Sequence, residues 1–326
     1  MRVAAKAKAS KKNTAAVKNA WVPLQKGDLI DIVAPAFRTA DQSVVRAEEY
    51  LKSRGYRVRV PADIFGKDVL CAQTDEIRFK QLKTALLAKD SKAVWCLRGG
   101  YGALRLIPEL MKLKAPKQSK LFIGLSDITT LHLYLYQQWK WPTIHGPMAD
   151  KISQGTIPGN FVEEVFRLVE GADTKISFES LTPLNAAATK KKVVRGEVIG
   201  GNLMTLSSHL GTKLKWNTKG KILFFEEIGE HDYRIDRIFE QLRQSGMIDN
   251  AAAIVLGDFT DCGVKDKTDK IWPVIQRFAD SLKIPMLRGI QSGHDPIQRP
   301  LPFGTPSELY LGDSAKLVCA TGVAAK

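Results

Sequence analysis

The sequence lacks the features of several protein classes. No apolar run approaches the roughly 20 residues of a membrane-spanning helix. No G-x-G-x-x-G follows the first strand-like segment, which argues against a dinucleotide-binding Rossmann enzyme. The four cysteines (Cys71, Cys96, Cys262 and Cys319) are far apart and show no metal-ligand spacing. We interpret Cys96, which lies within an apolar strand pattern, as a buried thiol.

Acidic residues are missing from the start of the chain. The first 27 residues contain seven Lys or Arg and no acid, so they contribute +7 to a net charge of +15. Lysines interrupt any signal-peptide core there, so we predict a disordered basic tail over residues 1–26 and a cytoplasmic protein. Two further basic clusters, Lys112–Lys120 and Lys190–Arg195, lack the interleaved aromatics of a base-stacking surface. We expect solvated faces rather than nucleic-acid binding, although attraction to an anionic polymer stays open.

Strand and helix patterns alternate between residues 27 and 150. This alternation predicts an α/β domain with a parallel sheet covered by helices on both faces. Residues 151–192 are polar apart from one expected amphipathic helix at residues 161–168 and are interpreted as a linker region, and residues 193–326 as a smaller α+β domain. The expected strands of the first domain are 29–34, 56–60, 93–97 and 121–124, and the expected helices are 41–53, 76–88, 103–110 and 128–138.

Two loops follow neighbouring strands of that predicted sheet, where ligands gather in such folds. One is Arg98–Gly102, and the other contains Ser126 in Gly124–Ile128. A serine at a strand-to-helix turn exposes its hydroxyl beside unpartnered helix N–H groups, as in a nucleophile elbow, although Ile128 replaces the usual second glycine. The alternative is an ordinary helix N-cap.

A nucleophilic serine requires a base and an acid that orients it. We rank His294 first as the base, because its loop places it after Gly293 and before Asp295-Pro296. The strand ending Phe225-Glu226-Glu227 supplies two carboxylates, of which only one can face a site. The other histidines are expected in apolar packing (His132), at a helix end (His209), exposed (His231), or in either a structural or a pocket-lining role (His145).

Seven short motifs occur in one order over most of the chain. They lie at residues 33–35, 95–102, 124–129, 145–147, 200–203, 225–230 with 233–237, and 293–294 with 301–304. With these motifs the chain resembles the LD-carboxypeptidase family of serine peptidases, which also includes microcin C self-immunity peptidases. The resemblance implies a flavodoxin-like N-terminal domain, a smaller C-terminal domain, an active site between them, and a homodimer.

The resemblance also implies roles for individual residues. Ser126 would be the nucleophile, His294 the general base and Glu226 the acid that orients it, with the N–H groups of Asp127 and Gly100 as the oxyanion hole. A carboxypeptidase also needs a cation for the substrate carboxylate, and Arg98, Arg234 and Arg237 stay open for this role. The substrate-binding candidates are Arg98, Gly99, Tyr101, Asn202 and Arg234.

The implied reaction removes the terminal D-Ala of murein tetrapeptide during peptidoglycan recycling or remodelling, and it implies no metal or organic cofactor. Three residues depart from the family pattern: Leu125 replaces an aromatic residue, Glu227 replaces Asp, and Gln298 replaces Asn. One alternative is a peptidase of peptidyl-nucleotides, for which Trp216 or Trp272 could supply an aromatic platform. The other is a non-catalytic module that binds an anionic polymer.

Overall fold

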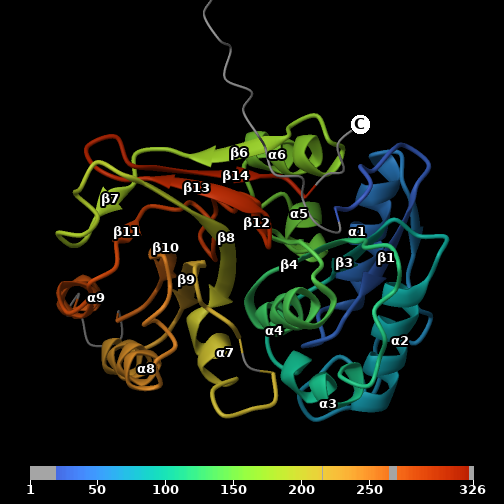
Figure 1. Ribbon diagram of the computed structural model, residues 1–326. Coiled ribbons are helices and arrows are strands. Elements are labelled where there is room, and N and C mark those ends of the chain that lie inside the picture. Colours follow the sequence, from blue (N-terminus) through green and yellow to red (C-terminus); the bar gives the residue numbers. More distant parts are fainter. Residues whose placement is uncertain (1–19, 215, 264–269, 323–326) are drawn as a thin grey trace, which may run out of the picture.

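The computed structural model describes residues 20–214, 216–263 and 270–322, which contain two β-sheets lying side by side (Figure 1). The first sheet has the order β12-β5-β4-β3-β1-β2, in which only the pairing of β12 with β5 is antiparallel. The order 2-1-3-4-5 confirms the predicted flavodoxin-like arrangement. The strands are β1 (Leu29–Val33), β2 (Arg57–Arg59), β3 (Ala93–Cys96), β4 (Leu121–Gly124), β5 (Thr143–His145) and β12 (Leu301–Phe303).

Helices cover both faces of this sheet because its buried strands carry apolar side chains on both sides. Ile30 and Ile32 of β1 pack in one cluster with Leu51, whereas Val33 packs in a second cluster with Leu82. One face is covered by α1 (Asp41–Ser53), α5 (Ala149–Gln154) and α6 (Gly159–Val169). The other is covered by α2 (Asp75–Leu87), α3 (Ile107–Leu110), α4 (Thr129–Tyr134) and the short helices η1 (Ala103–Leu106), η2 (Ser126–Ile128) and η3 (Leu135–Trp139).

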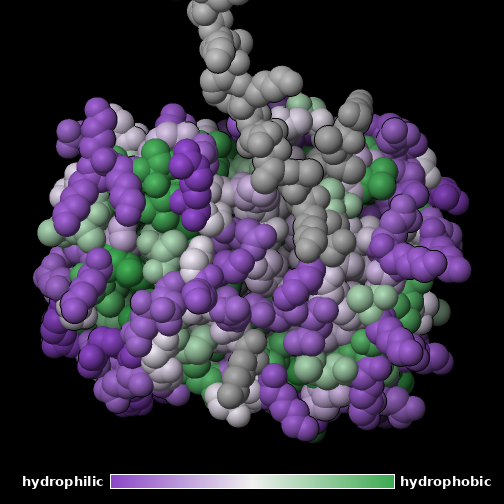
Figure 2. Space-filling model, in the orientation of Figure 1, coloured by the Kyte–Doolittle hydropathy of each residue, from purple (hydrophilic) through white to green (hydrophobic). Residues whose placement is uncertain are grey.

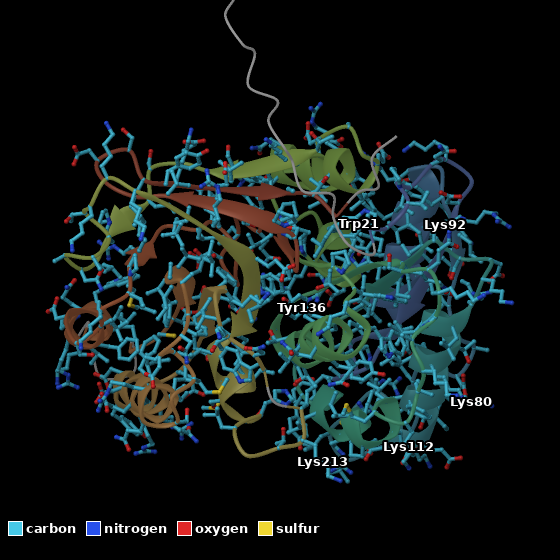
Figure 3. All side chains as sticks on the ribbon, in the orientation of Figure 1. Trp21, Lys80, Lys92, Lys112, Tyr136 and Lys213 are labelled. Carbon is cyan, nitrogen blue, oxygen red and sulfur yellow. The ribbon has the colours of Figure 1, made fainter. Side chains whose placement is uncertain are left out.

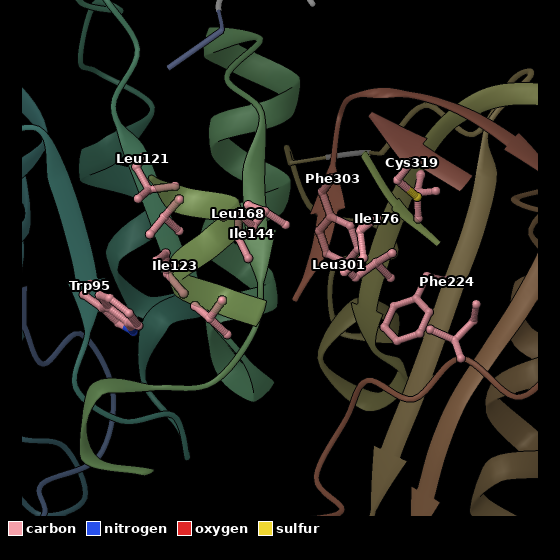
Figure 4. Packing of buried hydrophobic residues seen from close by; sticks show 14 of the residues in the cluster. Trp95, Leu121, Ile123, Ile144, Leu168, Ile176, Phe224, Leu301, Phe303 and Cys319 are labelled. Carbon is pink, nitrogen blue, oxygen red and sulfur yellow. The ribbon is translucent and has the colours of Figure 1, made fainter. Parts of the chain in front are cut away.

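The second sheet has the order β6-β14-β13-β8-β9-β10-β11-β7, with β8 to β11 mutually parallel. Helices α7 (Leu203–Ser207), α8 (Asp232–Gln244) and α9 (Ile271–Asp280) cover one of its faces. Phe224 on the other face packs with Phe303 of β12, so the two sheets share a core (Figure 4). The strands are β6 (Lys175–Phe178), β7 (Thr182–Pro183), β8 (Val193–Asn202), β9 (Ile222–Ile228), β10 (Ala253–Thr260), β11 (Met286–Arg288), β13 (Pro306–Tyr310) and β14 (Lys316–Ala320).

Two segments differ from the sequence-based expectations. Residues 20–26, assigned to the basic tail, are anchored at two positions: Trp21 and Leu24 are buried, and the main-chain N–H of Trp21 donates to the Gly322 carbonyl at 2.8 Å. Residues 1–19 of that tail lie outside the described residues. The predicted linker contains the expected helix, as α6, and also two strands that were not expected, β6 and β7, at the edges of the second sheet. Strands this short carry too little side-chain alternation to be recognised in a polar stretch.

The surface face in Figure 2 is mainly hydrophilic, with hydrophobic residues scattered in small groups. Lys80, Lys92, Lys112 and Lys213 project at the periphery, whereas Tyr136 lies between the two sheets (Figure 3). Most of the two lysine clusters is exposed, as predicted for solvated faces. Lys120 is the exception, because it is buried and its Nζ donates to the Ala85 carbonyl at 2.6 Å. No helix among the described residues has the length and apolarity needed to cross a bilayer.

Candidate active site

Ser126 occupies a strained turn at the end of β4. Its φ of +67° lies in the left-handed region, which costs a non-glycine residue about 1–2 kcal/mol. Gly124 permits the following helix to fold back on the strand, because a Cβ there would lie 2.5 Å from Ile128 Cγ2. The turn therefore has the strand-to-helix geometry that the sequence predicted, and it leaves Ser126 half-buried rather than in the core.

The loop after β3 lies directly against this serine. A Cβ on Gly99 would lie 2.9 Å from Ser126 Cβ and 3.3 Å from Ser126 Oγ, so only glycine lets the two backbones approach this closely. Gly100, the predicted oxyanion donor of the same loop, has φ +110°. Arg98 and Tyr101 are exposed on the loop.

The Asp127 side chain ties the two loops together. Its Oδ2 accepts a hydrogen bond from the Ala103 N–H at 2.8 Å. Burial raises the pKa of Asp127 to about 6, and the Ala103 N–H opposes that shift. The sequence identified Asp127 only for its main-chain N–H; its side chain has this second, structural role.

Glu226 and His294 form a buried pair at the end of β9. Glu226 is fully buried, and its Oε2 accepts a hydrogen bond from His294 Nδ1 at 2.6 Å. Burial alone would raise the pKa of Glu226, but the charge of His294, the hydrogen bond from His294 and the proximity of His145 lower it to about 2. Burial would lower the pKa of His294, and the Glu226 carboxylate raises it above its ordinary value. This arrangement leaves Nε2 of His294 available as a base.

Glu227 lies on the opposite side of the strand, as the alternation predicted. Its Oε1 accepts from Asn202 Nδ2 at 2.8 Å and its Oε2 from the Met204 N–H at 2.8 Å. Burial raises its pKa to about 7, with the nearby Glu226 charge adding to the shift. Glu227 therefore supports the start of α7 rather than the histidine.

Asn202 and Gly201 join the second sheet to the Ser126 turn. The Asn202 N–H donates to Thr129 Oγ1 at 2.9 Å, and Thr129 begins the helix that follows Ser126. Gly201 has φ +130°, and a Cβ there would lie 2.3 Å from Thr129 Oγ1. Figure 1 shows α4 facing β8 and α7 at this junction. Asn202 Oδ1 also caps α7 by accepting a hydrogen bond from the Thr205 N–H at 3.0 Å. Asn202 thus connects the second sheet to the helix that follows Ser126.

The predicted cations have different surroundings. Arg234 on α8 is exposed and pairs with Glu230, with Nη1 and Oε2 3.4 Å apart. Arg237 packs over the Tyr233 ring. Arg98 directly precedes Gly99, and its charge counteracts part of the burial-driven rise in the pKa of Asp150. Of the three arginines, Arg98 is the one on the loop that contacts Ser126.

The sequence left the role of His145 open and did not single out Asp258. His145 is fully buried at the end of β5, with Nδ1 3.2 Å from Ser292 Oγ and Nε2 3.9 Å from Glu226 Oε1. Burial raises the pKa of Asp258 to about 7, and Asp295 and Glu226 add to the rise. Strand pairing between distant segments brings both residues close to the Glu226–His294 pair, and such pairing has no local sequence signal.

The remaining histidines and the two tryptophans lie in other environments. His132 is buried with both ring nitrogens hydrogen-bonded, as expected for packing, and His209 is buried with Nε2 3.0 Å from Thr130 Oγ1. His231, expected to be exposed, is half-buried and stacks on the Tyr233 ring. Trp216 is 3% exposed and packs against Phe225, whereas Arg288 lies over the ring of Trp272. Among the described residues, no group of three or more His, Cys, Asp or Glu side chains could hold a metal ion.

Two family models match this chain. Residues 30–146 match the LD-carboxypeptidase N-terminal domain and residues 195–309 the LD-carboxypeptidase C-terminal domain. A protein of Rickettsia conorii, whose name places it among carboxypeptidases, is 37% identical over 292 residues, covering 89% of this chain and 90% of the relative. The murein tetrapeptide carboxypeptidase of Pseudomonas aeruginosa is 30% identical over 89% of this chain and 94% of its own length.

Solved structures agree with these matches. The crystal structure of muramoyltetrapeptide carboxypeptidase from Oxalobacter formigenes superimposes with a TM-score of 0.79 at 30% identity, covering 90% of this chain and 98% of that one. The microcin C7 self-immunity protein of Escherichia coli is also similar in sequence, with 28% identity over 86% of this chain and 90% of its own length. The relatives thus include both murein tetrapeptide carboxypeptidases and a microcin self-immunity protein.

Proposed function

The chain belongs to the LD-carboxypeptidase family of peptidases, and on that basis we propose that it is a serine LD-carboxypeptidase that removes the terminal D-Ala from murein tetrapeptide. The observation that carries the proposal is the contact between His294 Nδ1 and the fully buried Glu226 Oε2 at 2.6 Å. A buried carboxylate that fixes an imidazole with its other nitrogen free is the acid–base half of a serine hydrolase. The strained turn at Ser126 supplies the nucleophile.

In the proposed mechanism, His294 Nε2 takes the Ser126 hydroxyl proton as Oγ attacks the carbonyl carbon between the L-centre and D-Ala. The N–H groups of Asp127 and Gly100 stabilise the oxyanion, and loss of one such donor typically costs about 10²–10³ in turnover. His294 then protonates the amine of the leaving D-Ala. Water repeats the sequence on the acyl-enzyme, with His294 again as base. Glu226 stays ionised throughout and stabilises the imidazolium.

We assign the recognition of the substrate's free α-carboxylate to Arg98. The loop that carries it lies against Ser126, whereas Arg234 is paired with Glu230. Arg98→Ala should raise KM for the tetrapeptide with a free carboxylate and leave KM for the C-terminally amidated peptide unchanged. Arg234→Ala serves as the matched control. An equal loss on both peptides would exclude this role for Arg98.

The activity is tested by mass spectrometry of murein tetrapeptide after incubation with wild-type protein, Ser126→Ala protein and chelator-treated wild type. We expect loss of one D-Ala mass with the wild type, retained under chelator and absent with Ser126→Ala. No loss with any sample would refute the murein substrate. Retained cleavage by Ser126→Ala would refute the nucleophile.

The peptidyl-nucleotide alternative receives less support from the described residues. A nucleobase cannot stack on Trp216 without repacking, because that ring is 3% exposed, and Arg288 already covers the ring of Trp272. The binding-module alternative predicts salt-sensitive binding that survives Ser126→Ala. We further propose a cytoplasmic homodimer that acts in peptidoglycan recycling. Light scattering coupled to gel filtration tests the dimer, which a monomeric mass would exclude.

A further inference from the structure

Glu226 lies between two histidines, and only one of them belongs to the proposed triad. His294 approaches Oε2, while His145 Nε2 lies 3.9 Å from Oε1 on the other side of the carboxylate. Glu226 and His145 are both fully buried. Among the described residues, Glu226 Oε1 and His145 Nε2 each lack a hydrogen-bond partner, and they face each other. Leaving two such atoms unpaired is costly, and a closure of about 1 Å pairs them both.

The surroundings of His145 restrict its Nε2 to this one partner. Its ring stacks on Phe303 with centroids 5.4 Å apart and meets the edge of Phe224 at 5.2 Å. His132 lies beyond, with ring centroids 6.3 Å apart and both of its own nitrogens already bonded to Gly124 and Thr143. Glu226 is therefore the polar group that His145 Nε2 faces.

The partner at Nδ1 decides the tautomer. Ser292 Oγ lies 3.2 Å from His145 Nδ1, and Ser292 is buried two residues before His294 in the same loop. If Nδ1 carried the proton, the lone pair of Nε2 would face a carboxylate. If the Ser292 hydroxyl donates to Nδ1 instead, the Nε2–H points at Glu226 Oε1. The second arrangement satisfies every group.

Resting on the proposed function, we propose that His145 is a positioning residue, held as the Nε2–H tautomer by Ser292, which donates to Glu226 Oε1 and so sets the basicity of the Glu226–His294 pair. The chain Ser292–His145–Glu226–His294 then extends the triad by two residues. The two histidines carry opposite tautomers, since His294 must keep its proton on Nδ1 to leave Nε2 as the base.

Removal of the His145 donor should raise the pH at which the Glu226–His294 pair takes up its proton. A carboxylate with one hydrogen bond fewer binds a proton more tightly, so the Glu226–His294 pair takes up its proton at a higher pH and loses the free base earlier on acidification. A hydrogen bond to a charged group corresponds to a shift of about one pH unit. The other titratable groups around the pair, Glu227 and Asp258, remain in place in each variant.

Two substitutions at His145 separate hydrogen bonding from packing. In Gln the amide nitrogen occupies the place of Nε2 and can donate to Glu226, whereas in Asn the amide reaches only the place of Nδ1. We would measure the rate at which a fluorophosphonate labels Ser126 between pH 5 and 9, by intact mass. His209→Asn, which removes another buried histidine, serves as the control for lost packing, and Ser292→Ala tests the tautomer.

We expect the midpoint of labelling to rise by about one pH unit in His145→Asn, with about tenfold slower labelling on the acid limb. His145→Gln and His209→Asn should keep the wild-type midpoint, and Ser292→Ala should raise the midpoint, as His145→Asn does. Identical profiles for Asn and Gln would overturn the proposal.

A second readout needs neither substrate nor a reactive serine. Long-range ¹H–¹⁵N spectra of the wild type report which ring nitrogen of each histidine is protonated. A proton on His145 Nδ1 would overturn the proposal even if the protein cleaves no murein peptide, and one on Nε2 would support it even then. Failure of the wild type to react with fluorophosphonate or tetrapeptide would instead count against the proposed function.

Discussion

The strain at Ser126 can be measured by comparing two variants that both lack the hydroxyl. Ser126→Ala keeps a Cβ at φ +67°, whereas Ser126→Gly removes the left-handed penalty of about 1–2 kcal/mol. Glycine also makes the unfolded chain more flexible, which lowers the stability of the folded state by about 0.5–1 kcal/mol relative to alanine. We therefore expect Ser126→Gly to be more stable than Ser126→Ala by about 1 kcal/mol, or about 2 °C in Tm. Urea unfolding and thermal unfolding of the two variants test this.

A control with the opposite sign is available at Ser208. This residue has φ −67°, where alanine fits without strain, and it loses the same kind of local hydroxyl contact in both variants. There the glycine variant should be less stable than the alanine variant by about 0.5–1 kcal/mol. The description of a strained turn at Ser126 is wrong if Ser126→Gly is no more stable than Ser126→Ala while the two Ser208 variants differ as stated.

Three further perturbations follow from the contacts around the site. Gly201→Ala should destabilise the protein by about 1–3 kcal/mol in urea, because its Cβ would meet Thr129 Oγ1 at 2.3 Å; unchanged stability would contradict the close approach of the two domains. Glu226→Gln should reduce kcat by about 10⁴ in a folded protein, since His294 loses its orienting charge, and near-wild-type turnover would contradict the triad. The pKa of Asp258 rises from 3.8 to about 7 on folding, so the native state binds the extra proton and stability falls as pH rises between these values. The stability of Asp258→Asn relative to wild type should therefore be higher at pH 8 than at pH 5. An equal stability difference at the two pH values would refute the raised pKa of Asp258.

Much of the first sheet could be predicted because its signals are local. The helix predicted at residues 41–53 is α1 with the same bounds, and the strand predicted at residues 121–124 is β4. Strand–helix alternation also implies parallel pairing, since parallel strands require a crossover. The edge strands β6 and β7 were missed because they are short and lie in a polar segment, where neither periodicity nor length distinguishes them from a loop.

The candidate site could be predicted only in part. Loop position and strand-end chemistry singled out Ser126, His294 and the Glu226-Glu227 pair, and the structure places His294 on Glu226. Our proposal of Arg98 over Arg234 depends on the pairing of Arg234 with Glu230, which their spacing of one helical turn makes possible but does not dictate.

His145 shows why the remainder could not be predicted. It reaches Glu226 because β5 lies between β4 and β12, so that its side chain lies at the edge where the first sheet meets β9. The pairing of β12 with β5 joins Leu301 to His145 and places the Ser292–His294 loop next to both. No local pattern specifies such a pairing, since the same three-residue strand fits several sheet edges equally well by hydrophobicity alone. The position of the Glu226–His294 pair therefore depends on long-range strand order, whereas the position of Ser126, the proposed nucleophile, depends on one turn.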